Sequence, residues 1–253
     1  MLEAIVLAGS LNAGSLRECS PAAKEALIKI SGRYMVDYVL GALDNTQEVK
    51  KIILVGVDPR DINYSGSKEI NGVPAGDSLL ASLENGISAA TPGNKVLLVT
   101  ADVPLLNSKV IKAFLEECGD WEDDLYYPIV SKQLSEYRYP EVKRTYAILR
   151  DGAFTGGNIF LLQPEALVRC KAMLKAGIEL RKSPWKLCRL LGISFLGKFI
   201  FRQLTLQEVE LKVQNLLGIK ARVVVTQYPE IGVDVDKPSD LRLVERELSK
   251  MPS

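Results

Sequence analysis

The feature that most constrains the fold of this chain is the alternation of short, β-rich segments with amphipathic segments. The β-rich segments carry few charges, as expected of strands that are buried on both faces of a sheet. Strands that cross over through helices give this pattern, so it predicts an α/β fold with a mostly parallel sheet. The expected strands lie at residues 4–7, 51–57, 95–100, 126–130, 159–162 and 222–226.

The amphipathic segments indicate where helices begin. Residues 35–43 and 78–89 each place their large aliphatic side chains on one helical face, and Asp77 precedes the second helix as a candidate N-cap. Asn107 has the same position before a helix that is expected to run to about residue 118. Pro238 stands where the first turn of a final helix favours proline.

One long region, residues 166–217, shows only helical periodicity, and within it Thr205 and Glu208 have the spacing of a capping box. We interpret the chain as one domain over residues 1–253 with a helical insertion at about residues 166–217. Basic and aromatic side chains there also fit a membrane-surface or partner-binding face, but we expect packing on the sheet and no stable membrane association. These side chains are Arg181, Lys182, Trp185, Lys186, Arg189, Phe195, Phe199 and Phe201.

The charge balance limits the partners and the chemistry. The chain has 32 Lys and Arg against 31 Asp and Glu, a net charge of +1, so it lacks the broad basic surface of a nucleic-acid-binding protein. It contains no histidine, which excludes histidine-based triads and zinc sites with imidazole ligands. Catalysis would have to use carboxylates, lysine, arginine, backbone amides or a hard metal ion.

The cysteines and the apolar segments indicate a cytoplasmic location. Cys19, Cys118, Cys170 and Cys188 are widely spaced, form no C-x-x-C pair, and are interpreted as reduced thiols. The N-terminus lacks the basic start and the long apolar run of a signal peptide. The most apolar later stretch, residues 192–201, is too short to span a bilayer.

The first expected strand ends in Leu7, Ala8, Gly9 and Ser10, followed by a loop of small residues up to position 23. Backbone amides of such a loop can surround phosphates, although a glycine-serine turn after a strand is also a common plain turn. The sequence matches neither the P-loop nor the Rossmann pattern, because serine replaces the P-loop lysine at position 15 and leucine stands at position 11. Arg17 and Lys24 could meet a polyphosphate, and the small residues predict few apolar anchors for the loop.

Two acidic segments follow expected strands. Asp102 comes directly after the strand at residues 95–100, where open α/β sheets bind ligands, and its carboxylate is a hard donor suited to Mg²⁺. Asp234 and Asp236 are two residues apart and would project to the same side of an extended segment. Alternatively, Asp102 caps a turn, and one of the other two caps the final helix.

Six segments in this order resemble the MobA-like NTP transferases, a nucleotidyltransferase family with a three-layer, GT-A-type α/β fold. The family includes molybdenum cofactor guanylyltransferase and relatives of sugar-phosphate and methylerythritol-phosphate cytidylyltransferases. The segments extend over nearly the whole chain, and each is weak alone. They read LAGS (7–10), EALIKISGRYMVDYVLGAL (25–43), AGDSLLASLENGI (75–87), LLVTADVPLL (97–106), FTGGNIFLLQPEAL (154–167) and IGVDVDKPSDL (231–241).

The resemblance implies roles for individual residues. Residues 7–10 would contact the nucleotide, and Gly76 and Ser78 would lie near its base. Asp102 would bind Mg²⁺ with a second carboxylate, Asp236, for which Asp234 is the alternative. Asn158 resembles a residue near the acceptor, and our own candidates for binding an anionic acceptor are Lys143 and Arg144.

The chain departs from the family at positions that would contact the triphosphate. Ser10 replaces a glycine, Arg17 comes after a longer loop, and Glu25 stands where the family has a lysine, with Lys24 one residue away. A lysine there would neutralise the charge that develops as pyrophosphate leaves, whereas a glutamate would repel it.

The expected function is transfer of a nucleoside monophosphate from an NTP to a hydroxyl or phosphorylated acceptor, with Mg²⁺ as cofactor and Arg17 and Lys24 as catalytic cations. The alternative is a nucleotide- or sugar-nucleotide-binding module without catalysis, which Glu25 favours. A glycosyltransferase is disfavoured, because its D-x-D motif is expected after a mid-domain strand, where this chain has only Asp102. The sequence leaves open the base, the acceptor and the oligomeric state.

Overall fold

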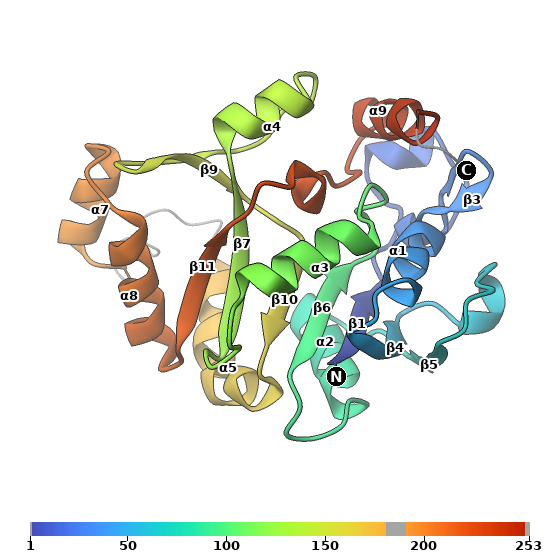
Figure 1. Cartoon of the computed structure of the whole chain (residues 1–253), viewed down its shortest axis with the longest axis horizontal. Helices are drawn as coiled ribbons and strands as arrows, with labels where there is room; N and C mark the ends of the chain where they lie inside the picture. The colour runs from blue at the N-terminus through green and yellow to red at the C-terminus, as the bar shows by residue number, and fades with distance from the viewer. Residues whose placement is uncertain (1, 181–190, 251–253) are drawn as a thin grey trace.

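A nine-stranded, mostly parallel sheet forms the centre of the computed structural model, which describes residues 2–180 and 191–250 (Figure 1). The strands are β1 (Leu2–Leu7), β4 (Val49–Val55), β5 (Glu69–Val73), β6 (Val96–Thr100), β7 (Leu125–Ser131), β8 (Ala147–Leu149), β9 (Gly152–Gly156), β10 (Ile159–Leu162) and β11 (Ala221–Val225). Their order is β5-β4-β1-β6-β10-β7-β9-β8, and β11 pairs with β7. The strand β10 runs antiparallel to both of its neighbours, β6 and β7.

Helices cover both faces of this sheet (Figure 1). The α-helices are α1 (Met35–Asp44), α2 (Leu79–Ser88), α3 (Ser108–Glu117), α4 (Lys132–Arg138), α5 (Pro164–Leu180), α7 (Ile193–Ile200), α8 (Leu206–Leu217) and α9 (Pro238–Leu248). Short 3₁₀ helices are η1 (Ser15–Glu18), η2 (Glu25–Leu27), η3 (Pro59–Asp61) and η4 (Pro229–Gly232), and a small hairpin joins β2 (Lys29–Ile30) to β3 (Arg33–Tyr34).

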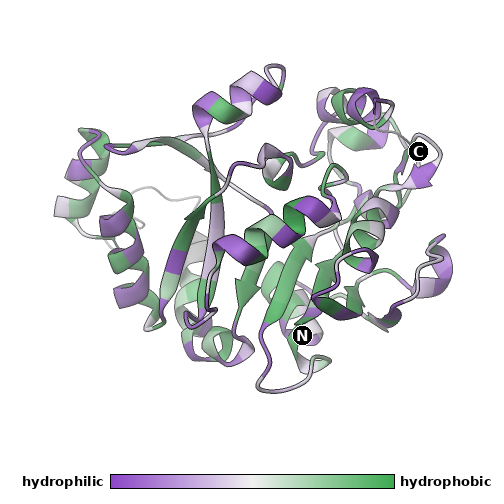
Figure 2. Ribbon diagram, in the orientation of Figure 1, coloured by the Kyte–Doolittle hydropathy of each residue, from purple (hydrophilic) through white to green (hydrophobic). Residues whose placement is uncertain are grey.

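Alternate side chains of the central strands enter two separate cores. Ala4 and Val6 of β1 belong to the core that includes α1 and α3, whereas Ile5 between them packs on the other face with Leu83 and Ile87 of α2. A strand buried in this way must be apolar at every position, which explains the uncharged runs in the sequence. Figure 2 shows the hydrophobic residues gathered in the central strands and hydrophilic ones on outer helices such as α8 and α9. The expected three-layer α/β fold is confirmed.

The six expected strands are confirmed, and the sequence missed three others of the large sheet, β5, β8 and β9. The missed strands are short and half-buried or exposed along most of their length, and β5 and β9 contain glycine. Their sequences therefore lack the apolar runs by which the central strands were identified.

The helix caps are partly as expected. The Asn107 side chain accepts a hydrogen bond from Val110 N (3.1 Å), and the capping box of Thr205 and Glu208 is present. The assignment of Asp77 is wrong: the N-cap of α2 is Ser78, whose hydroxyl accepts from Ala81 N at 3.1 Å. Asp77 lies one residue too early to reach the first free amides of the helix.

The acidic pair before α9 does not cap that helix. Pro238 is in the first turn as expected, but the N-cap residue is Lys237. The carboxylate of Asp240 accepts from the backbone amides of Asp236 and Lys237, both at 3.2 Å. The side chains of Asp234 and Asp236 are therefore not explained by capping of α9.

The region from residue 166 to 217 is helical where it is described, in α5, α7 and α8. None of the described helices has the length and apolarity that crossing a bilayer requires. The basic and aromatic positions Arg181, Lys182, Trp185, Lys186 and Arg189 lie outside the described residues, as does Cys188. The thiols of Cys19, Cys118 and Cys170 are free, as expected.

Candidate active site

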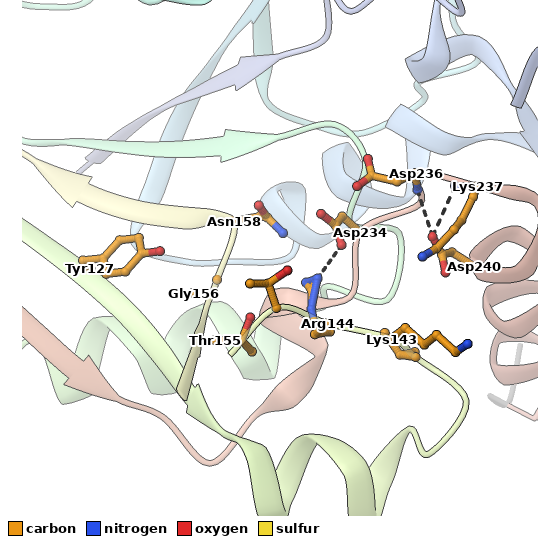
Figure 3. A pocket seen from close by; sticks show the side chains of 13 residues that line it. Tyr127, Lys143, Arg144, Thr155, Gly156, Asn158, Asp234, Asp236, Lys237 and Asp240 are labelled. Carbon is orange, nitrogen blue, oxygen red and sulfur yellow. Dashed lines mark hydrogen bonds and ion pairs between the residues drawn. The ribbon is translucent and has the colours of Figure 1, made fainter. Parts of the chain in front are cut away.

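A cavity of about 430 Å³, here called the polar pocket, brings together most of the residues that the sequence indicated for the acceptor and the metal (Figure 3). It lies where β9 and the start of β10 meet the segment that leads into α9. The sequence-predicted residues in its lining are Lys143, Arg144, Asn158, Asp234 and Asp236. Residues separated by up to 93 positions, from 143 to 236, thus share one site.

Asp102 lies beside this pocket at the end of β6. Its carbonyl oxygen accepts from Val235 N at 2.9 Å, which fixes the segment containing Asp234 and Asp236 against the strand end. Burial raises the pKa of Asp102 to about 6, and repulsion from Asp234 and Asp236 adds to this increase. A hydrogen bond from Thr100 acts in the opposite direction. Burial and the charge of Asp234 also raise the pKa of Asp236. The three carboxylates are therefore close enough to interact electrostatically.

The donor chemistry of this acidic group suits Mg²⁺. Carboxylate oxygens are the hard ligands that the ion prefers, and a divalent cation would offset both the burial and the mutual repulsion that raise the pKa values of Asp102 and Asp236. Across residues 2–180 and 191–250, however, no three acidic or thiol side chains are already arranged around one ion position. Asp234 is ion-paired, whereas Asp102 and Asp236 form no ion pair with the residues that the structure describes, so these two fit the expected ligand roles.

Arg144 holds the third carboxylate. Its Nη1 forms a charged hydrogen bond with Asp234 Oδ1, and the Arg144 side chain is only 10% exposed (Figure 3). The Nε of the same guanidinium is buried and has no hydrogen-bond partner among the described residues. An unsatisfied donor next to a cavity is costly unless a ligand or water meets it, which supports the choice of Arg144 for binding an anion.

Asn158 and Lys143 reach the pocket from different surroundings. Asn158 is fixed through its backbone, because its carbonyl accepts from Thr100 N (3.2 Å) and its amide donates to Ile231 O (2.8 Å). Its side chain points into the pocket, whereas Lys143 lies exposed at the rim (Figure 3). Asn158 is thus held in place, and Lys143 is free to follow a ligand.

A second cavity of about 510 Å³, here called the N-terminal cleft, lies at the ends of β4 and β5. Lys24 lines it, and its Nζ donates a hydrogen bond to the carbonyl of Gly56. Gly9, at the end of β1, packs on the same segments: a Cβ there would be 2.8 Å from the Cβ of Ala75. Gly56 has φ +94°, and a Cβ there would be 2.4 Å from Gly9 Cα. Close packing therefore requires both glycines, independently of the phosphate-binding role that the sequence suggests for Gly9.

The loop from Ser10 to position 23 is anchored more firmly than its composition indicates. Leu16 is fully buried, and the buried side chain of Asn12 donates to Ser20 O and Ala22 O, both at 3.0 Å. The expectation of few anchors overlooked these residues. Arg17 is exposed, and its guanidinium donates to Asn12 O at 3.3 Å, so the structure does not bring it into either cavity.

The residues expected near the base have structural roles of their own. A Cβ at Gly76 would lie 2.4 Å from the Cβ of Ala81, and the Gly76 amide donates to Ser82 Oγ at 3.0 Å. Ser78 caps α2. These contacts explain both residue types through packing at the start of α2, beside the N-terminal cleft that Ala75 lines.

Sequence reasoning missed several residues of the polar pocket. Lys237 and Asp240 lie in the quoted segment at 231–241, so closer attention to its charges could have found them. Thr155 and Gly156 of β9 lie in the quoted segment at 154–167 but were not singled out there, and no local motif marks Tyr127 of β7. Their contribution depends on the antiparallel pairing of the two strands, in which Ile129 faces Gly156.

Comparison with known proteins identifies the family. The profile of the MobA-like NTP transferase domain matches residues 4–180, which include β1, the N-terminal cleft, Asp102 and Asn158. The chain belongs to the MobA-like NTP transferase family. A search of curated proteins found no match.

Solved structures agree with this membership. A hypothetical transferase from Thermus thermophilus has a TM-score of 0.82 and 37% identity, over 95% of this chain and 99% of the other. The fold is shared with 4-diphosphocytidyl-2C-methyl-D-erythritol synthase from Anaerococcus prevotii (TM-score 0.60, 16% identity, 99% of each chain). It is also shared with CMP:2-keto-3-deoxy-manno-octonic acid synthetase in complex with CTP (TM-score 0.59, 14% identity, 98% of each chain). The family assignment therefore places the polar pocket and the N-terminal cleft within a nucleotidyltransferase fold.

Proposed function

We propose that this protein is a magnesium-dependent nucleotidyltransferase that transfers a nucleoside monophosphate from an NTP to an anionic small-molecule acceptor. A hydroxyl or phosphate oxygen of the acceptor would attack the α-phosphorus, and the bond to the leaving pyrophosphate would break. The observation that carries the proposal is the acidic group of Asp102, Asp234 and Asp236 beside a pocket that also contains Lys143 and Arg144.

The charges of the polar pocket support an anionic ligand together with a cation. Three basic side chains, Lys143, Arg144 and Lys237, line the pocket with three acidic ones, Asp234, Asp236 and Asp240. Because the charges of the two sets are equal in number, the acidic side offsets much of the attraction that an anion alone would feel from the basic side. Mg²⁺, held by Asp102 and Asp236, would neutralise phosphate charge. Arg144 and Asn158 would then orient the acceptor.

The N-terminal cleft is the proposed nucleotide side. The strand ends of β1, β4 and β5 lie at the edge where open α/β sheets bind ligands. Gly9, within residues 7–10, packs on Gly56 and Ala75, which line the cleft, and Gly76 and Ser78 follow Ala75 in the chain, where the family resemblance implies the base. Lys24 already reaches across the cleft to the carbonyl of Gly56, so a triphosphate would offer its ammonium group a stronger partner.

The first experiment measures thermal stabilisation by each of the four NTPs, with and without Mg²⁺. A ligand at 100 times its dissociation constant should add roughly 2.7 kcal/mol to the free energy of unfolding. We expect one or two NTPs to stabilise the protein, and only with Mg²⁺. No stabilisation by any NTP at concentrations of about 1 mM would contradict the proposal, since such ligands should bind more tightly than that.

A binding module without catalysis is the second candidate, and one contact favours it. The carboxylate of Glu25 is close enough to Asp236 to help raise its pKa, after burial and the charges of Asp234 and Asp240. The position of the family lysine therefore carries a negative charge that faces the metal side of the site. Pyrophosphate release from a matched NTP and an acceptor panel distinguishes the candidates, because the binding module would release none.

A further inference from the structure

A third cavity, here called the apolar cavity, has no role in the function proposed above. It measures about 390 Å³ and lies between the strands β7, β8, β9 and β11 and the helices α7 and α8. The walls that the described residues form are almost entirely hydrocarbon and include Ile129, Leu149, Phe154, Leu196, Phe199 and Val209. Its volume falls in the range of about 300–1,000 Å³ that is typical of small-molecule sites.

The apolar cavity adjoins the polar pocket. Tyr127, Thr155 and Gly156 line both of them, so the two spaces share one wall. At this wall a Cβ on Gly156 would lie 1.8 Å from the Tyr127 hydroxyl, which shows that the tyrosine side chain packs directly on the glycine backbone. The Tyr127 ring also stacks on Phe160, with centroids 5.5 Å apart. The Tyr127 side chain therefore occupies the space over Gly156, and a ligand that extends from the polar pocket into the apolar cavity has to displace it.

The chemistry of the apolar walls selects the occupant. A nucleotide or a sugar would lose hydrogen bonds to water there without gaining partners, which costs free energy for every unsatisfied polar group. A hydrocarbon chain has no hydrogen bonds to water to lose, and its burial removes apolar surface from water. An apolar cavity next to a charged pocket is thus complementary to an amphiphile.

We propose that the acceptor is an amphiphile, with an anionic head in the polar pocket and a hydrocarbon chain in the apolar cavity. This inference rests on the proposed function, because only a transferase has an acceptor. The binding of the hydrocarbon chain can nevertheless be tested without catalysis. The shared chemistry is a phosphate or similar anion that carries an alkyl or isoprenoid-like chain, either as a soluble molecule or within a bilayer.

The test measures binding of the soluble series ethyl, butyl, hexyl and octyl phosphate by calorimetry, each below its micellar concentration. Each methylene that enters the cavity should tighten binding about four-fold, which equals about 0.8 kcal/mol at 1.36 kcal/mol per ten-fold. We expect octyl phosphate to bind at least about 100-fold more tightly than ethyl phosphate, after allowance for incomplete burial. Equal affinities along the series would overturn the inference.

Two variants locate the chain. Ala147→Trp places a large side chain at the wall of the apolar cavity from the edge strand β8, where the position is exposed enough to accept it. Its matched control is Ile148→Trp, because the next residue of a strand points to the opposite face and does not line the cavity. We expect Ala147→Trp to remove the dependence on chain length and Ile148→Trp to keep it.

A second substitution, Leu196→Gln, puts a polar group into the cavity from α7 without adding bulk. It should weaken octyl phosphate binding about ten-fold or more and leave ethyl phosphate binding unchanged. A far-UV circular dichroism spectrum like that of the wild type and a cooperative thermal transition show that both cavity variants are folded. Unchanged chain-length dependence in folded Ala147→Trp and Leu196→Gln would overturn the inference.

A sedimentation assay with lipid vesicles identifies the source of the amphiphile. Phosphatidylcholine vesicles with and without hexadecyl phosphate are sedimented with the protein. Co-sedimentation that requires hexadecyl phosphate and is lost in Ala147→Trp supports a membrane source, whereas binding of octyl phosphate alone supports a soluble one. Failure of both arms overturns the inference.

The two proposals fail separately. If an NTP with Mg²⁺ stabilises the protein but chain length has no effect, the transferase proposal stands and the amphiphilic acceptor is wrong. If chain length matters but no NTP binds, the cavity takes an amphiphile and the transferase proposal is wrong.

Discussion

The polar pocket and the N-terminal cleft lie at the same edge of one sheet but are built in opposite ways. In the polar pocket, charged side chains such as Arg144 and Asp236 meet on segments that the fold brings together from distant positions. In the cleft, most of the wall is backbone and small residues, and close packing of Gly9 on Ala75 and Gly56 determines its shape.

This difference predicts how substitutions will act. A charged side chain beside a cavity can be replaced with little damage to the core, so changes in the polar pocket should affect binding and transfer more than folding. A glycine in close backbone contact cannot accept a Cβ without a local shift, so changes in the cleft should affect folding first.

The largest effect is expected for Asp102→Asn. Loss of one carboxylate charge should abolish the Mg²⁺-linked stabilisation by NTPs and reduce transfer on the order of 1,000-fold, the upper scale for one preorganised charge contact. Titration calorimetry of NTP with Mg²⁺ and a pyrophosphate-release assay measure the two quantities. The control is Asp120→Asn, an exposed aspartate that lines neither cavity and should behave as wild type. Magnesium-dependent NTP binding that persists in Asp102→Asn would contradict the metal assignment.

Lys24→Ala tests whether the cleft contributes charge as well as shape. If Lys24 supplies the cation that the family places one residue later, transfer should fall on the order of 100-fold, while NTP binding weakens much less. Steady-state kinetics then show the loss in kcat rather than in KM. Lys29→Ala, a nearby exposed lysine on β2, is the control. Equal losses in the two variants would show that Lys24 has no special role.

Glu25→Lys is the reciprocal substitution. In a working enzyme it should disturb a site that is arranged around Glu25 and lower transfer. In a chain that only binds nucleotides, the same change should strengthen triphosphate binding by removing a like charge. The direction of the change in NTP affinity and in pyrophosphate release therefore separates the two candidate functions.

Glycine substitutions in the cleft should act on stability. Gly9→Ala puts a Cβ 2.8 Å from that of Ala75, and Gly56→Ala adds an unfavourable φ of +94° to a contact with backbone. We expect losses of about 1–3 kcal/mol, or roughly 2–4 °C in Tm per kcal/mol for a chain of this size. Gly14→Ala is the matched control, since no atom lies within 4 Å of its Cβ position and its φ is −94°. Wild-type Tm values for Gly9→Ala and Gly56→Ala would show that the cleft is not closely packed.

Local sequence signals predicted the central strands and the strand-end carboxylates, because these depend on short-range pattern. The uncharged run before Asp102 marks both a buried strand and the point where it ends. The same logic missed β8 and β9, whose short, glycine-containing or exposed segments gain stability only from pairing with one another and with β7.

The composition of the site was only partly predictable for the same reason. Asp234 and Asp236 were identified from their spacing, but the ion pair of Asp234 with Arg144 joins residues 90 positions apart. The shared wall of Tyr127, Thr155 and Gly156 likewise depends on strand register. In the cleft, the need for Gly9 could be read as phosphate binding, whereas the structure shows a packing contact that no local pattern encodes.

The smallest expected effect is a change of stability with pH in the Asp102→Asn protein, measured without metal or nucleotide. Burial raises the pKa of Asp102 from 3.8 to about 6, so the folded state favours the protonated carboxyl group. Its contribution to stability is fully present below about pH 4 and is lost as pH rises through 6. Above pH 6 the wild-type protein carries a charged group that folding disfavours, and the neutral asparagine does not. The shift sets an upper limit of about 3 kcal/mol. We expect about 1 kcal/mol, because protein dipoles and water rearrange around an ionised carboxylate and stabilise it. Asp102→Asn should therefore raise the Tm by a few degrees at pH 7.5 in the presence of a chelator and leave it unchanged at pH 4.

A lower Tm of Asp102→Asn at pH 7.5 would mean that the carboxylate stabilises the protein even without metal or nucleotide. The polar pocket would then resemble the cleft, with a residue retained for folding as well as for function.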